Sequence, residues 1–163
     1  MHVSDVHLGH FRGKAFMQKI VNATKTQNVA VIFITGDLFD GKYNLNMDVL
    51  SPLKELDIPI YYVEGNHDGY TGSKLIKNKL RETGVLVLEN EVTHLGEFQI
   101  IGLTHMLADK NEVNIHASGQ GATIKTVLSS LKIEKNIPSI LLHHSPDGVE
   151  FANKVGVDLF LAG

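Results

Sequence analysis

The sequence predicts a single α/β domain in which helices cover a largely parallel β-sheet. Segments with the pattern of buried strands alternate along the chain with segments of helical period, and no internal repeat or low-complexity linker interrupts them. The length of 163 residues and the hydrophobic fraction of 43% are those of one globular domain with a single core.

The first elements are a short strand, an amphipathic helix and a buried strand. The chain opens in what looks like the end of a strand, and residues 12–26 then have the period of a helix. The helix face expected to be buried consists of Ala15, Phe16, Ile20, Ala23 and Thr24. Residues 29–36, VAVIFITG, form an apolar run ending in glycine, as in a strand buried on both faces.

A strand between two helices comes next. Residues 46–56 predict a helix, with Pro52 either inside it or in its first turn. IPIYYVEG at 58–65 predicts a strand. Residues 73–83 predict a helix that starts on Ser73 as N-cap and stops at Gly84.

The second half of the chain changes character. Residues 85–103 alternate and turn at Leu95-Gly96-Glu97, which predicts an antiparallel hairpin at a sheet edge or in a second sheet. The polar segment 107–121 predicts a long mobile loop near the functional site. The remaining elements are a helix, a strand, a short helix and a last strand, at residues 120–132, 137–144, 147–155 and 157–163.

Composition excludes several classes of protein. The 15 Lys and Arg residues are scattered and the net charge is -3, so we expect no binding to long nucleic acids. The chain has no cysteine, which leaves His, Asp, Glu and Asn as metal ligands. No apolar run approaches the roughly 20 residues that span a bilayer, and the N-terminus lacks the pattern of a signal peptide.

Polar residues that can bind metal ions follow four predicted strands. They are DVH at 5–7, GD at 36–37 with Asp40, GNHD at 65–68, and HH at 143–144. Because the carboxyl ends of parallel strands face one crevice, these groups are expected to converge. On an extended segment Asp5 and His7 would project to the same side, where they could hold one metal ion together.

Each of these motifs also has an ordinary explanation when taken alone. Acidic residues at strand ends often cap helices, and Asp40 could instead serve a turn before Gly41. The ordered set of four is what points to a metal site. The remaining histidines are expected to be ordinary surface or loop residues, namely His2, His10, His94, His105 and His116.

In this order, SDVHLG, GDLFDG, GNHDG and HHSPD resemble the motifs of the calcineurin-like metallophosphoesterases. The resemblance covers essentially the whole chain, and it implies a four-layer αββα sandwich of mixed sheets flanked by helices. GNHDGYTG, VLVLENEVTHL and the segment from 140 to 163 look most like the bacterial branch of UDP-2,3-diacylglucosamine pyrophosphohydrolases and membrane-associated phosphoesterases.

The resemblance implies a dinuclear metal site. Asp5 and His7 would bind one ion, Asp37 would bridge both, and Asn66 and a late histidine would bind the other. A carboxylate has two oxygens to share between two cations, whereas an amide offers a neutral oxygen. The family spacing H-x-P favours His144 over His143 as the late histidine, and adjacent strand residues point to opposite faces.

The resemblance also implies a catalytic role for His67, which would donate to a phosphate oxygen or to the leaving group. Asp40 would orient His67, and Asp68 would assist. Two divalent ions of manganese, iron or zinc, about 3.5–4 Å apart, would activate a hydroxide for in-line attack on phosphorus. No covalent phosphoenzyme is needed.

The chain departs from the family pattern at its C-terminal end. The last family motif, GHxH, is absent from the 163 residues, and Gly163 stands where its first letter would be. We therefore expect a domain, residues 1–163, that is truncated at both ends, and the activity of these residues alone is open.

Three functions remain. The first is a phosphoesterase that hydrolyses a phosphodiester, phosphomonoester or pyrophosphate bond of a small substrate. The second is a non-catalytic metal-binding module of the same fold, and the third is a nuclease or nucleotide phosphodiesterase, against which the lack of a basic patch argues. We expect a cytoplasmic protein, with membrane association through a missing N-terminal segment and the oligomeric state left open.

Overall fold

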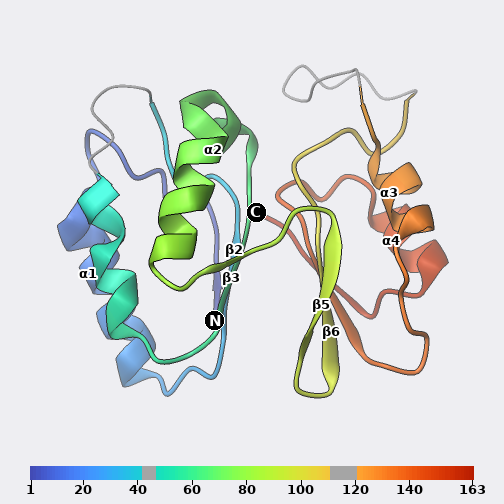
Figure 1. Cartoon of the computed structure of the whole chain (residues 1–163), viewed down its shortest axis with the longest axis horizontal. Coiled ribbons are helices and arrows are strands. Elements are labelled where there is room, and N and C mark those ends of the chain that lie inside the picture. The colour runs from blue at the N-terminus through green and yellow to red at the C-terminus, as the bar shows by residue number, and fades with distance from the viewer. Residues whose placement is uncertain (42–46, 111–120) are drawn as a thin grey trace.

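A computed structural model describes residues 1–41, 47–110 and 121–163, and it contains two four-stranded β-sheets packed face to face. Helices cover the outer face of each sheet, so the chain forms four layers (Figure 1). The predicted αββα sandwich is confirmed. Within the described residues, no helix combines the length and the apolar character that crossing a membrane requires.

The first sheet is entirely parallel, with strand order β1-β2-β3-β4. Its strands are β1 (His2–Val3), β2 (Ile32–Thr35), β3 (Ile60–Val63) and β4 (Leu86–Val87). The expectation of two mixed sheets is wrong for this one, because a helical connection follows each of its first three strands and returns the chain to the same end.

The second sheet is mixed, with strand order β5-β6-β7-β8. Its strands are β5 (Glu91–Leu95), β6 (Phe98–Gly102), β7 (Ser139–Leu142) and β8 (Leu159–Leu161). β5 and β6 form the predicted antiparallel hairpin, whereas β6, β7 and β8 are parallel. The carboxyl ends of these three strands therefore lie at one edge.

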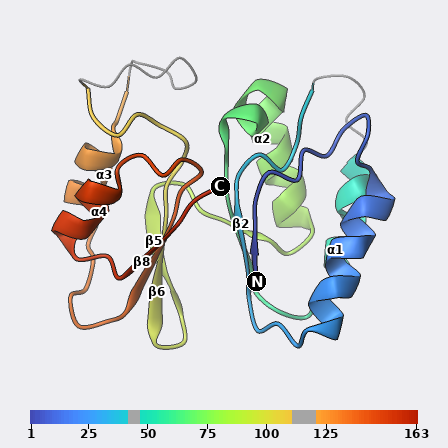
Figure 2. The same cartoon turned by 180° about the vertical axis from the view of Figure 1, so that it is seen from behind.

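In the described part of the chain, five helical segments connect the strands. They are α1 (Lys14–Thr26), the 3₁₀ helix η1 (Met47–Glu55), α2 (Asn66–Glu82), α3 (Ile124–Ser130) and α4 (Val149–Val155). Pro52 lies inside η1, where its missing N–H removes a hydrogen bond of a regular α-helix. Figure 2 shows α1 and α2 on the side of the first sheet that faces away from the second sheet, and α3 and α4 on the opposite side of the molecule.

Two helix predictions need correction. The buried face of α1 is Met17, Val21 and Thr24, while Ala15 is exposed, because the buried residues follow the i, i+4, i+7 spacing from Met17. The helix expected to start at Ser73 begins seven residues earlier, at Asn66. Gly72, at φ 136°, interrupts the helical backbone in a conformation that glycine allows, so Ser73 follows a kink inside the helix instead of capping its start.

Three buried apolar clusters separate the four layers. The cluster between the sheets is Phe33, Tyr61, Val63, Leu88, Ile100 and Leu142. Their neighbours along the strands, such as Ile34, Tyr62 and Leu141, belong instead to the clusters under the helices. Side chains of one strand thus alternate between two cores, which explains the continuous apolar runs in the central strands. Most of the predicted loop at 107–121, including His116, lies outside the described residues.

Candidate metal centre

The loops that follow β1 and β2 run side by side. Beyond the strands, the N–H groups of Asp5, His7 and Leu8 donate to the carbonyl oxygens of Gly36, Asp37 and Leu38, at 3.2, 3.0 and 2.8 Å. The pairing places the side chains of these two loops at the carboxyl edge of the first sheet. This is the convergence that the order of motifs predicts.

Three residues in these loops other than glycine have left-handed backbone conformations. Asp5, His7 and Asp37 have φ values of 54°, 48° and 49°. Asp5 and His7 therefore do not lie on an extended segment, and that part of the prediction is wrong. Their side chains nevertheless face each other, with Oδ1 of Asp5 3.6 Å from Nε2 of His7. Strained conformations of this kind cost energy and concentrate at functional sites.

Asp37 occupies the centre of the cluster and is only 3% exposed. Its Oδ2 lies 3.9 Å from Nε2 of His7 and 3.3 Å from Nε2 of His144, and its Oδ1 accepts a hydrogen bond of 2.9 Å from the backbone N–H of His67. Burial raises the pKa of Asp37, but the hydrogen bonds from His144 and His67 outweigh it, so the pKa lies below its usual value. One carboxylate oxygen is thus shared by two histidines from different sheets.

His144, and not His143, faces Asp37. The Nδ1 of His144 lies 2.8 Å from the carbonyl oxygen of Thr35. Because a carbonyl only accepts, Nδ1 carries a hydrogen. A protonated His144 also donates through Nε2 to Asp37, whereas a neutral His144 would keep a lone pair on Nε2, where it could bind a metal ion. His143 is fully buried and donates through Nδ1 to the carbonyl of Ser145 at 2.8 Å.

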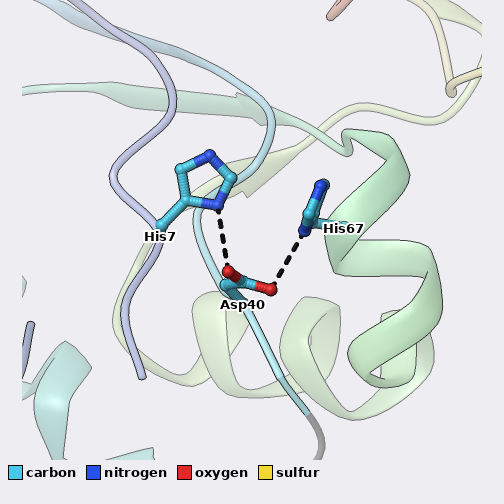
Figure 3. Close-up of side chains that lie close together, drawn as sticks. All are labelled: His7, Asp40 and His67. Atoms are coloured by element: carbon cyan, nitrogen blue, oxygen red, sulfur yellow. Dashed lines mark hydrogen bonds and ion pairs between the residues drawn. The ribbon is translucent and has the colours of Figure 1, made fainter. Parts of the chain in front are cut away.

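Asp40 lies between two histidines (Figure 3). Its Oδ1 is 3.0 Å from Nδ1 of His67, and its Oδ2 is 3.8 Å from Nδ1 of His7. The rings of His7 and His67 meet edge to face with centroids 5.0 Å apart. The side chain of Asp40 therefore forms the contact with His67 that the sequence predicts, and it is half exposed at this position.

Asn66 and Asp68 both belong to the first turn of α2. Asn66 is half-buried beside Gly65, whose backbone approaches so closely that a Cβ there would lie 2.2 Å from Oδ1 of Asp37. Asp68 is fully buried and accepts hydrogen bonds from the N–H groups of Phe39 and Gly65 at 2.8 and 3.0 Å. Burial raises the pKa of Asp68 despite these bonds. Asp68 ties the two loops together and has no exposed surface from which to assist a reaction.

The C-terminal end of β8 reaches the same edge. The N–H of Gly163 donates to the carbonyl of His144 at 2.7 Å, and a Cβ on Gly163 would lie 3.0 Å from Oδ2 of Asp5. The ends of five strands, β1, β2, β3, β7 and β8, therefore meet around Asp37.

His105 is a member of this region that the sequence did not identify. Expected to be an ordinary loop histidine, it stacks on His143 with ring centroids 5.9 Å apart and meets His144 edge to face at 5.8 Å. Burial lowers its pKa, and neither of its ring nitrogens has a hydrogen-bond partner in the described part of the chain. Its position three residues after β6, a strand parallel to β7, is the signal that could have indicated it. His2, His10 and His94 are exposed, as expected.

The burial of His143 predicts a loss of stability in acid. Burial lowers the pKa of His143 to about 4, so the folded chain keeps it neutral while the unfolded chain takes up a proton below pH 6.5. The stabilisation by the neutral ring is complete above pH 6.5 and lost as pH falls to about 4, by about 3 kcal/mol. Urea unfolding in EDTA, measured between pH 7 and pH 4, checks this.

His143→Gln should flatten that pH dependence, because glutamine does not titrate. His94→Gln, at an exposed position, should leave the pH dependence of the wild-type chain unchanged. An equal acid slope in wild type and His143→Gln would contradict the prediction.

The donor atoms of the cluster fit a divalent metal ion. Within the described ranges, ligand atoms of Asp5, His7 and Asp37 lie within 4.8 Å of one another, and so do those of His7, Asp40 and His67. Imidazole and carboxylate together suit zinc, iron and manganese. In the second set, Asp40 already forms a hydrogen bond with His67. The first set contains the buried Asp37, whose Oδ2 also lies near Nε2 of His144, so Asp5, His7, Asp37 and His144 are the better candidate ligands.

The chain is similar to known metallophosphoesterases. A family model described as calcineurin-like phosphoesterase matches residues 1–163. An "Uncharacterized metallophosphoesterase" of Helicobacter pylori is 30% identical over 164 residues, which are 99% of this chain and 42% of the relative. "Phosphodiesterase YaeI" of Escherichia coli is 30% identical over 172 residues, covering 99% of this chain and 57% of the relative.

A third relative has a name that refers to a membrane. "Transmembrane protein with metallophosphoesterase domain" of Bos taurus is 30% identical over 172 residues, which cover 98% of this chain and 37% of the relative. The chain thus spans between 37% and 57% of the length of these three relatives.

Proposed function

Because the chain belongs to the calcineurin-like phosphoesterase family, we propose that it hydrolyses a phosphodiester bond of a small substrate with the help of two divalent metal ions. Membership of the family supports a metal-dependent phosphoesterase in general. The name of the E. coli relative, a phosphodiesterase, favours a diester over a monoester or a pyrophosphate. The finer resemblance to lipid-precursor pyrophosphohydrolases stays a prediction.

The observation that carries the proposal is the position of Asp37. Its Oδ2 lies 3.9 Å from Nε2 of His7 and 3.3 Å from Nε2 of His144. Asp5 and His7 would hold one ion, Asn66 and His144 the other, and Asp37 would contribute to both. When bound, two such ions would offset the charge of a phosphate group and lower the pKa of a water molecule.

His67 would act on the substrate directly. Its Nδ1 is bonded to Asp40, so Nε2 points away from Asp40 and remains available (Figure 3). A carboxylate behind an imidazole fixes its tautomer and stabilises its protonated form. His67 would therefore bind a phosphate oxygen or give its proton to the leaving group.

The exposure of the cluster supports access for a substrate. Asp37 is nearly buried, but the side chains of Asp5, Asp40 and His67 are 46%, 54% and 39% exposed. The cluster therefore opens to solvent on the side of His67, where a substrate could reach it.

The test is hydrolysis of bis(p-nitrophenyl) phosphate by the purified protein. We expect release of p-nitrophenolate that requires Mn²⁺, stops in EDTA and returns when Mn²⁺ is added back. Hydrolysis of p-nitrophenyl phosphate should be slower, because we propose a diester substrate. Tight binding of metal ions with no hydrolysis of either ester would overturn the proposal in favour of a non-catalytic module.

We also propose that the protein associates with a membrane. Its support is the name of the bovine relative. Co-sedimentation of the protein with phospholipid vesicles would test it.

A further inference from the structure

The loop that carries Asp5 and His7 has a backbone shape that needs support. Both residues are left-handed, with φ of 54° and 48°, and an L-residue pays roughly 1–2 kcal/mol for that conformation. Between and after them, Val6 and Leu8 are buried at 3% and 0% exposure. The loop thus sends alternate side chains into the core and toward the candidate metal centre.

The N–H groups of this loop are held by the neighbouring loop after β2, through the three hydrogen bonds to Gly36, Asp37 and Leu38. Two carbonyl groups on its other edge are held by a single side chain. Nη1 of Arg12 donates to the carbonyl oxygen of Val6 at 2.8 Å and to that of Asp5 at 3.3 Å.

Arg12 is itself fixed from two directions. The guanidinium lies over the ring of Phe16, 5.2 Å from its centroid, which ties it to α1. The N–H of Gly9 donates to the carbonyl of Arg12 at 2.9 Å and closes the turn between the loop and the helix. The guanidinium of Arg12 is therefore already oriented, and it loses little conformational entropy when it donates to the two carbonyl groups.

We propose that Arg12 is a positioning residue that keeps Asp5 and His7 in the geometry required for metal binding, an inference that rests on the proposed function. The carbonyls of Asp5 and Val6 belong to the two peptide units between Asp5 and His7. When the planes of these two peptide units are fixed, so are the backbone angles that determine the directions of the Asp5 and His7 side chains. Without Arg12, the loop can relax toward right-handed or extended conformations, which turn the two ligands away from each other.

A purely electrostatic role for Arg12 predicts the opposite result. A guanidinium behind a cation site repels the cation, so its removal would tighten metal binding. Weaker metal binding after removal of the Arg12 side chain would therefore indicate a positioning role, and tighter binding would indicate an electrostatic role.

The first measurement is calorimetric titration of the chain with Mn²⁺. Arg12→Ala should weaken binding by about 10- to 100-fold, the usual effect of losing a residue that orients a ligand. Arg12→Lys should recover most of the affinity, since an ammonium can donate to both carbonyls. Lys14→Ala removes an equal charge two residues away, from an exposed pair with Asp48, and should change nothing.

The second measurement needs no metal. In EDTA, the amide of His7 is protected by its hydrogen bond to Asp37, and Arg12→Ala should speed its hydrogen exchange by about tenfold, while amides paired between β2 and β3 keep their rates. If wild type itself binds no Mn²⁺, the proposed function fails, and the exchange rates still decide the role of Arg12. Tighter Mn²⁺ binding by Arg12→Ala, or unchanged binding and exchange, would overturn the inference.

Discussion

Asp37→Asn should lower kcat/KM for Mn²⁺-dependent hydrolysis of bis(p-nitrophenyl) phosphate by about a thousandfold or more, because several kcal/mol of charge stabilisation depend on the metal ions. Asparagine has the shape of aspartate and can still accept the hydrogen bond from the N–H of His67. Its NH₂ group would then face His7 and His144, where Oδ2 now lies. An NH₂ group donates and cannot bind a cation.

Calorimetry with Mn²⁺ should show the loss of affinity together with the loss of activity. Asp57→Asn is a matched control, since Asp57 is exposed and outside the cluster, and it should behave as wild type. Activity of Asp37→Asn within tenfold of wild type would show that Asp37 does not bridge two ions.

His67→Asn should reduce kcat by about 10²- to 10⁴-fold for a diester with a poor leaving group, the usual contribution of a general acid. The loss should be smaller for a p-nitrophenyl ester, because p-nitrophenolate leaves without a proton. Affinity for Mn²⁺ should stay the same, since His67 is expected to contact the substrate and not the ions. Asp40→Asn should cause a smaller loss, about 10- to 100-fold, through the orientation of His67.

His94→Asn is the control for this series, because His94 is an exposed histidine on β5 at 3.5 Å from Glu134. Equal losses for good and poor leaving groups would assign His67 to the binding of phosphate. A kcat equal to that of wild type would remove it from the reaction altogether.

The strands and the order of the motifs could be predicted because they depend on local patterns. A strand buried on both faces is mostly apolar, as Ile32–Thr35 and Ile60–Val63 are, and a glycine after it marks the turn. The alternation of apolar and polar residues on both sides of Gly96 predicts the hairpin that joins Leu95 to Phe98. Each of these signals extends over fewer than ten residues and needs no knowledge of the rest of the chain.

Other features depend on contacts between distant segments, and sequence reasoning missed them. Ser73 has the character of an N-cap and predicts a helix start there, whereas α2 begins at Asn66 and continues across the non-helical Gly72. His105 looked like a loop residue, since only the parallel pairing of β6 with β7 brings it to His143. The left-handed conformations of Asp5 and His7 have no sequence signature, as glycine would be expected at such positions.

The sequence by itself determined the alternation of strands and helices, the types of ligand and their order along the chain, because apolar patterning and side-chain chemistry are local properties. Only the tertiary structure decided that Asp37 lies between His7 and His144 and that Arg12 supports the loop of Asp5 and His7. The reason is physical: these relations arise where the ends of strands from two sheets meet, and no short stretch of the chain contains them.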